Sequence, residues 1–111
     1  MSVSVIVTNP KNNKEKLINI PIAAEAFFQN YWLPLINQLE LKWLKCFQSG
    51  LEISYDDKDN VIKELKRLKL YLLYQGLMND NNTFMTERLD NLINKIEEIF
   101  DQRKDVTLYI G

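Results

Sequence analysis

The spacing of apolar residues changes along this chain, and the change limits the folds that it can adopt. Apolar residues alternate over residues 3–7 and again over 106–110, which is the period of a strand with one buried face. Over most of residues 23–103 they recur at steps of three and four, the period of an amphipathic helix. The sequence therefore predicts strands at both ends of the chain and helices between them.

A β-hairpin is predicted at the start. Residues 3–7 and 16–22 each place apolar side chains on one face, and the polar stretch over residues 9–13 separates them. Pro21 has no amide proton to donate to a neighbouring strand. We therefore expect the second strand to lie at the edge of the sheet, or to end near Pro21.

A long helix over residues 23–49 is predicted next, with Gly50 as its stop. Pro34 removes one backbone donor from it, so we expect a kink, or two abutting helices, at residues 31–33. The apolar residues at helical spacing are Phe28, Trp32, Leu35, Leu39, Trp43 and Cys46.

The second half of the sequence has the pattern of a short strand over 51–55, helices over about 58–75 and 84–103, and a closing strand. The first of these helices has Asp56, Asp57 and Asp59 as candidate N-caps and Gly76 as its end, and Thr83 is the candidate cap of the second. The element order indicates a single α+β domain over residues 1–111, with three main helices packed on one face of a small sheet.

The chain contains no histidine and one cysteine, Cys46. This excludes Ser-His and Cys-His catalysis, His-ligated metals and a structural zinc site. An enzyme would have to rely on carboxylates, lysine or tyrosine alone. We therefore expect a protein that is not an enzyme and that has no cofactor and no metal, with Cys46 as a buried inert thiol.

Charge and hydropathy bear on the class of partner. The formal net charge of −1 gives no global attraction to nucleic acid or to anionic lipid. No apolar run approaches the roughly 20 residues needed to cross a bilayer, and the start lacks the pattern of a secretory leader. We expect a cytoplasmic protein with a protein partner, no membrane contact and no major role for nucleic acid. The oligomeric state stays open.

The last predicted helix carries an acidic ridge opposite its apolar arc. Its members fall within about one third of a helical turn, and they are Glu87, Asp90, Glu97, Glu98 and Asp101. One interpretation is a solvated helix face. The other is a docking surface for a basic protein, since closely spaced like charges gain when a cationic partner arrives.

A second acidic cluster, Glu52, Asp56, Asp57 and Asp59, surrounds the start of the middle helix. Carboxylates there favour the positive end of the helix dipole, so capping accounts for part of the cluster. We treat Asp56, Asp57 and Asp59 as second-choice partner contacts.

The middle helix offers alternatives of a different class. Leu70 and Tyr74 fall opposite its core arc, so either another element covers them or they are exposed anchors of a regulatory or adaptor protein. A short basic patch on the same helix could contact phosphates, although such residues are usually plain surface. The patch consists of Lys63, Lys66, Arg67 and Lys69.

The chain resembles the small immunity proteins that bacteria carry beside a toxin, in being short, α+β and marked by acidic patches. Residues 99–110 are also similar in pattern to the last helix and strand of the barstar family of ribonuclease inhibitors. The resemblance implies an inhibitor that neutralises a toxin, such as a basic nuclease, encoded by an adjacent gene. The barstar inhibitory segment has no counterpart here, so none of its functional residues is transferred.

Overall fold

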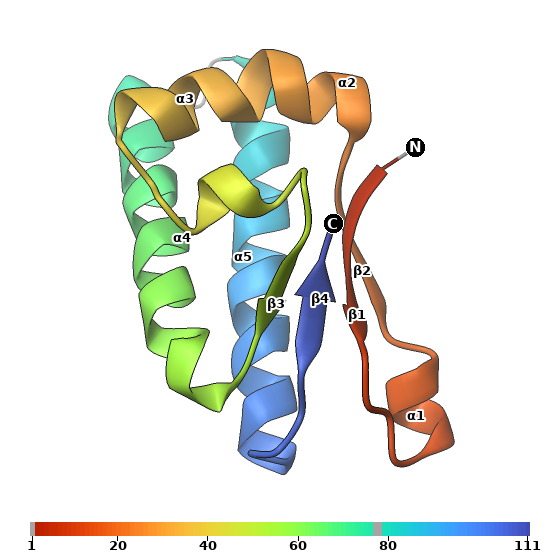
Figure 1. Ribbon diagram of the computed structural model, residues 1–111. Coiled ribbons are helices and arrows are strands. Elements are labelled where there is room, and N and C mark those ends of the chain that lie inside the picture. The colour runs from red at the N-terminus through yellow and green to blue at the C-terminus, as the bar shows by residue number, and fades with distance from the viewer. Residues whose placement is uncertain (1, 77–78) are drawn as a thin grey trace.

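The computed structural model describes residues 2–76 and 79–111 and confirms the α+β fold. The strands are β1 (Ser2–Val7), β2 (Asn19–Ala24), β3 (Leu51–Ile53) and β4 (Leu108–Ile110). The helical segments are α1 (Asn13–Lys16), α2 (Glu25–Phe27), the π-helical η1 (Phe28–Trp32), α3 (Leu33–Gln38), the 3-10 turn η2 (Leu44–Cys46), α4 (Tyr55–Gln75) and α5 (Asp80–Gln102). Helices α4 and α5 lie on one face of the sheet, and α2 and α3 cross one end (Figure 1).

The sheet is antiparallel in the order β2-β1-β4-β3, so the first and last strands lie side by side at its centre. This arrangement confirms the N-terminal hairpin and the closing strand. Val3, Val5 and Val7 of β1 are buried against the helices. Ile6 and its cross-strand partner Tyr109 are partly exposed on the opposite face, which the helices leave open.

β2 is an edge strand, as Pro21 predicts. Arg88 of α5 donates a hydrogen bond to the Pro21 carbonyl at 3.1 Å and so ties this edge to the helical layer. The strand begins at Asn19, not at residue 16, because residues 13–16 form the short helix α1. The side chain of Asn12 caps α1 by accepting from the Glu15 amide at 2.8 Å.

The prediction of a helix over residues 23–49 is wrong for the residues after α3. The interruption expected near Pro34 is present as the π-helical turn η1, which directly precedes α3. The helix then ends at Gln38, and Glu40 adopts a left-handed φ of 56°. The amides of Glu40 and Leu41 donate back to Asn37 and Ile36 at 3.2 and 3.0 Å, which is the bonding pattern of a Schellman cap.

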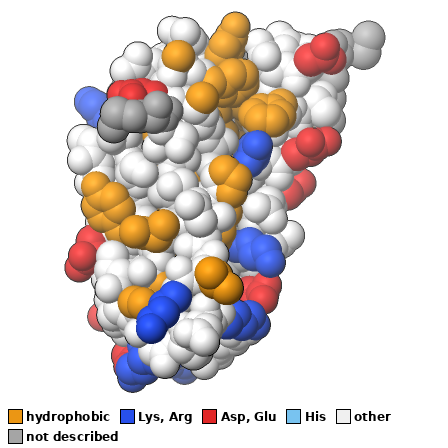
Figure 2. Space-filling view, turned by 90° about the vertical axis from the view of Figure 1, so that its right-hand side faces the viewer, with side chains coloured by type: hydrophobic (Ala, Val, Ile, Leu, Met, Phe, Trp, Pro, Cys, Tyr) orange, Lys and Arg blue, Asp and Glu red, His pale blue; other side chains and the backbone are white. Residues whose placement is uncertain are grey.

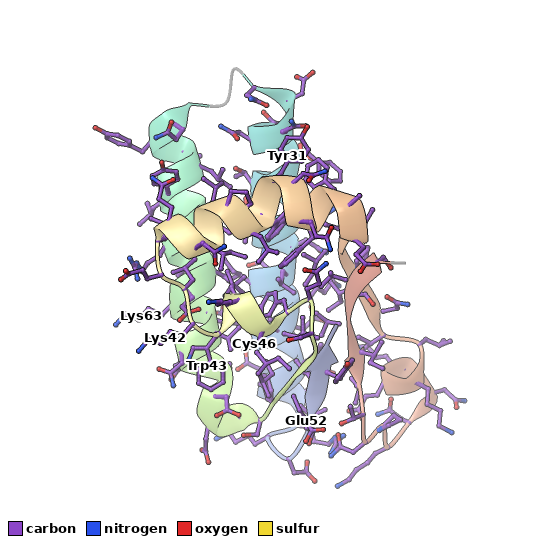
Figure 3. The ribbon with its side chains drawn as sticks, turned by 45° about the horizontal axis from the view of Figure 1, so that its top comes forward. Tyr31, Lys42, Trp43, Cys46, Glu52 and Lys63 are labelled. Atoms are coloured by element: carbon purple, nitrogen blue, oxygen red, sulfur yellow. The ribbon has the colours of Figure 1, made fainter. Side chains whose placement is uncertain are left out.

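Side chains of α4 hold the segment that follows this break. The carboxylate of Glu64 accepts from the backbone amides of Trp43 and Leu44, at 2.9 and 3.1 Å. Tyr71 accepts from the Gln38 side chain at 2.9 Å. Figure 3 shows Trp43 and Cys46 on this segment, beside α4. Contacts distant in sequence therefore hold Trp43 and Leu44, and the local backbone bonds after α3 form only short turns, such as those from Lys45 to Leu41 and from Phe47 to Leu44.

Helix α4 starts at Tyr55, three residues before the predicted start. Its N-cap is Ser54, not one of the candidate aspartates, and the Asp57 carboxylate accepts from the Ser54 amide at 3.0 Å to form a capping box. The predicted strand before it is present over Leu51–Ile53. Gly76 ends α4 with a φ of 92°, as expected.

Helix α5 starts at Asp80, so the predicted start at residue 84 is wrong. Asn79 is the N-cap, because its side chain accepts from the Asn81 amide at 2.8 Å, and Thr83 lies within the first turn. The predicted apolar arc is confirmed as buried: Met85, Leu89, Leu92, Ile93, Ile96, Ile99 and Phe100. Among the described residues, none of the helices has the length and apolar character that a membrane span requires.

Candidate interaction surface

The outer face of the α4 and α5 pair is the candidate site, because the predicted acidic, basic and apolar anchor residues meet there. Two adjoining hollows run between the helices and share Lys66, Leu70 and Glu97. The other lining residues come from both walls: Asp59, Ile62, Lys63, Arg67, Lys69 and Leu73 from α4, and Asp90, Ile93 and Asn94 from α5. We call this surface the α4–α5 face.

The five residues of the predicted acidic ridge differ in their surroundings: Asp90 and Glu97 line a hollow beside α4, and Glu98 lines a hollow beside β2. Glu87, Glu98 and Asp101 are exposed, whereas Asp90 and Glu97 are half-buried along the hollows. Asp90 pairs with Lys69 of α4, with Nζ 2.5 Å from Oδ1. Glu98 lies 3.8 Å from Lys95 one turn away on the same helix. The ridge is therefore partly compensated within the chain.

The second acidic cluster is mostly explained by the start of α4. Asp57 belongs to the capping box, Asp56 is exposed in the first turn, and Asp59 lies 3.9 Å from Lys58. Only Asp59 lines the same hollow as Glu97. The structure therefore brings one member of this cluster onto the α4–α5 face.

Leu70 and Tyr74, whose surroundings the sequence leaves open, are exposed, at 66% and 89%. Leu73, which sequence reasoning missed, is also 41% exposed and lines one hollow with Leu70. Its position three residues after Leu70 is the signal that could have identified it. These three side chains form an apolar strip on the last turns of α4.

The basic patch on α4 borders this strip. Lys63, Lys66 and Arg67 are exposed, and Lys69 is half-buried in its pair with Asp90. Arg67 also donates to the Leu39 carbonyl at 3.4 Å. In Figure 3, Lys63 of α4 and Lys42 of the segment after α3 project on the same side of the molecule. The α4 wall therefore carries four cations and Asp59, opposite the anionic α5 wall.

A network of four charged side chains shifts the pKa values of three of its members, and sequence reasoning missed it. Its residues are Glu15, Arg103, Asp105 and Lys11. Arg103 donates to both carboxylate oxygens of Glu15, at 2.9 and 3.1 Å, and this lowers the pKa of Glu15. Lys11 and then Arg103 lower the pKa of Asp105 to about 2. The Glu15 partner in turn raises the pKa of Arg103. This network ties the hairpin loop to the segment after α5 and lies away from the α4–α5 face.

A second apolar hollow lies beside β2. Phe27 and Phe84 pack edge to face with ring centroids 5.5 Å apart, and the Arg88 guanidinium lies 4.8 Å from the Phe84 ring centre. Pro21, Ala23 and Ala24 complete most of the lining. Figure 2 shows hydrophobic side chains gathered along this side of the molecule.

The other candidate reactive groups are possible metal ligands and the Cys46 thiol. Over residues 2–76 and 79–111, no group of three or more His, Cys, Asp or Glu side chains is arranged to hold a metal ion. Cys46 is half-buried, and its thiol lies 3.6 Å from the Lys42 carbonyl, so the expectation of full burial is wrong. The α4–α5 face offers charge and apolar area for contact with a macromolecule.

Comparison with known proteins finds no matching family model, no matching curated protein and no matching solved structure.

Proposed function

We propose that this chain is a non-enzymatic binding protein, and that its specific role is to neutralise a bacterial toxin by protein–protein contact, as an immunity protein does. The observation that supports binding is the α4–α5 face, where Leu70, Leu73 and Tyr74 are exposed between charged walls. Apolar side chains surrounded by polar ones are the usual anatomy of a protein interface. An exposed tyrosine is also among the residues that most often contribute strongly to binding.

The acidic ridge supports the choice of a basic partner. Glu87, Glu98 and Asp101 are exposed on the outer side of α5, so their carboxylates are accessible to a second molecule. A toxin that cleaves nucleic acid needs a cationic surface to hold phosphates, and carboxylates can occupy such a surface in their place. The proposed contacts are therefore the ridge first and Asp59 next, with Asp56 and Asp57 as weaker candidates.

The test uses the protein encoded by the adjacent gene as the named partner. Binding is measured by calorimetry for the wild-type chain and for Glu87→Lys with Asp101→Lys. The matched control, Glu40→Lys with Glu52→Lys, makes the same change in net charge at exposed positions off the face. The proposal expects the ridge variant to lose at least about a hundredfold in affinity and the control to lose little. Absence of binding by the wild-type chain, or equal losses in both variants, would contradict it.

A second candidate is a helical regulatory or adaptor protein that binds through its apolar strip. The exposure of Leu70 and Tyr74 favours it. The same calorimetry separates the two functions with Leu70→Asp. An adaptor loses its affinity on this substitution and keeps most of it when the ridge is reversed, whereas a toxin inhibitor that relies on the ridge shows the larger loss on charge reversal.

A further inference from the structure

The two walls of the α4–α5 face carry opposite charge. Over residues 63–67 of α4 the outward cations are Lys63, Lys66 and Arg67, while Glu64 is turned to the opposite side and bound to backbone amides. Asp59, one turn before Lys63, is the acidic residue of this wall. The ridge of α5 is anionic, and the cations Arg88 and Lys95 of that helix lie towards β2, where Glu98 of the ridge lines the same hollow as Lys95. The face is therefore divided lengthwise into a basic half with an apolar strip and an acidic half.

We propose that this face is self-complementary and binds a second copy of the chain. The helices α4 and α5 lie side by side and run in opposite directions (Figure 1). When a second copy is related by a two-fold axis parallel to these helices, its α4 lies against the α5 of the first copy. Each basic half then meets an acidic half, and both contacts form at once, as a closed dimer requires.

The charge pattern selects this arrangement over its alternative. A two-fold axis perpendicular to the helices would place α4 against α4 and α5 against α5, so that like charges face one another at a cost in affinity. The formal net charge of −1 per chain leaves little long-range repulsion to oppose pairing. Pairing also covers Leu70 and Tyr74, which are exposed in the single chain.

This inference rests on the charges and exposure of the face and does not require the proposed function. Where both hold, the second copy and a basic partner compete for the acidic ridge, and binding of the partner dissociates the dimer. The dimer is tested on the purified chain alone. Its failure and the failure of partner binding are therefore separate results.

The experiment follows sedimentation velocity of the purified chain from about 10 to about 500 μM, at about 20 mM and about 500 mM salt. A concentration-dependent dimer that weakens at high salt is expected. The first variant, Lys63→Glu with Lys66→Glu, makes both halves acidic. The second, Glu87→Lys with Glu97→Lys and Asp101→Lys, leaves two carboxylates and three lysines on the ridge and so makes both halves basic. Each variant alone is expected to dimerise at least about tenfold more weakly than the wild-type chain.

Mixing the two variants tests directly whether opposite charges on the two halves drive dimerisation. Each contact in the mixed pair joins an acidic half to a basic half, so a one-to-one heterodimer is expected. The control, Lys14→Glu with Lys16→Glu, changes net charge equally on α1 and should leave dimerisation of the otherwise wild-type chain unchanged. Circular dichroism checks that every variant folds. A monomeric wild-type chain, dimers of either variant as strong as those of the wild type, or no heterodimer in the mixture would each overturn the proposal.

Discussion

Lys69 of α4 and Asp90 of α5 form an ion pair, with Nζ 2.5 Å from Oδ1, that joins the basic wall to the acidic ridge. The two side chains are 33% and 48% exposed, so the pair contributes at most about 1 kcal/mol to stability. Its larger consequence is for binding. Asp90 already has a cation beside it, and the exposed carboxylates of Glu87 and Asp101 are the ridge members best placed to meet another molecule.

Replacing Glu40 by glycine should stabilise the protein. Glu40 holds a left-handed φ of 56° in the Schellman cap of α3, a conformation that glycine adopts without a Cβ clash. The expected gain in the free energy of unfolding is about 0.5 to 1 kcal/mol, measured by urea denaturation. Glu40→Ala keeps the Cβ and should give no comparable gain. A loss of stability in Glu40→Gly would contradict the assignment of the cap.

Replacing Glu64 by alanine should destabilise the segment after α3. The carboxylate accepts from the amides of Trp43 and Leu44, and its loss leaves both without this acceptor. We expect a decrease of about 1 to 3 kcal/mol in the free energy of unfolding, and faster hydrogen exchange at those two amides. Glu64→Gln keeps an acceptor oxygen and should lose less. Equal losses in the two variants would show that the hydrogen bonds are unimportant.

Glu40 and Glu64 also show which part of the fold could not be predicted from the sequence. The apolar arcs of α4 and α5 and the alternation in β1 were predicted because each depends on local periodicity. The helix break at Glu40 was not, because residues 39–49 keep a helical period. Glu64, which accepts from the Trp43 and Leu44 amides, and Arg67, which donates to the Leu39 carbonyl, lie at least 20 positions away and hold the backbone there in another path. A single sequence does not reveal which distant side chain supplies such an acceptor.

The candidate site was predicted in part for the same reason. Helical spacing placed Leu70 and Tyr74 away from the core, and both are exposed. It also placed the ridge on one side of α5, whereas Asp90 and Glu97 line the hollow beside α4 and Glu98 lines the hollow beside β2. The pairing of Asp90 with Lys69 depends on how α4 packs against α5, and the central position of β4 depends on strand order. Neither follows from the period of one element.

Stability should fall with acid through the Glu15, Arg103 and Asp105 network. The pKa of Asp105 is lowered from 3.8 to about 2, and that of Glu15 is also lowered, so the folded chain favours their ionised forms. Their contribution is complete above the unfolded pKa values and is lost as pH falls from about 4 to about 2. Thermal midpoints of wild type and Asp105→Asn between these pH values should converge as pH decreases. A constant difference would contradict the assignment.

Replacing Gly50 by alanine should destabilise the chain for two separable reasons. Gly50 has a φ of 107°, and a Cβ there would clash with the Tyr109 hydroxyl oxygen. The expected loss is about 1 to 3 kcal/mol in the free energy of unfolding. Adding Tyr109→Phe removes the nearest atom and should recover part of the loss, while the backbone strain remains. A double-mutant cycle measures this coupling, and additive effects would contradict the predicted contact.

A map of backbone amide chemical shifts on titration with the protein encoded by the adjacent gene shows directly which surface binds. We expect shifts to concentrate on the α4–α5 face, around Leu70, Tyr74 and Asp101, and the open face of the sheet around Ile6 and Tyr109 to be unaffected. Shifts confined to that open face, or to the hollow beside β2, would contradict this expectation.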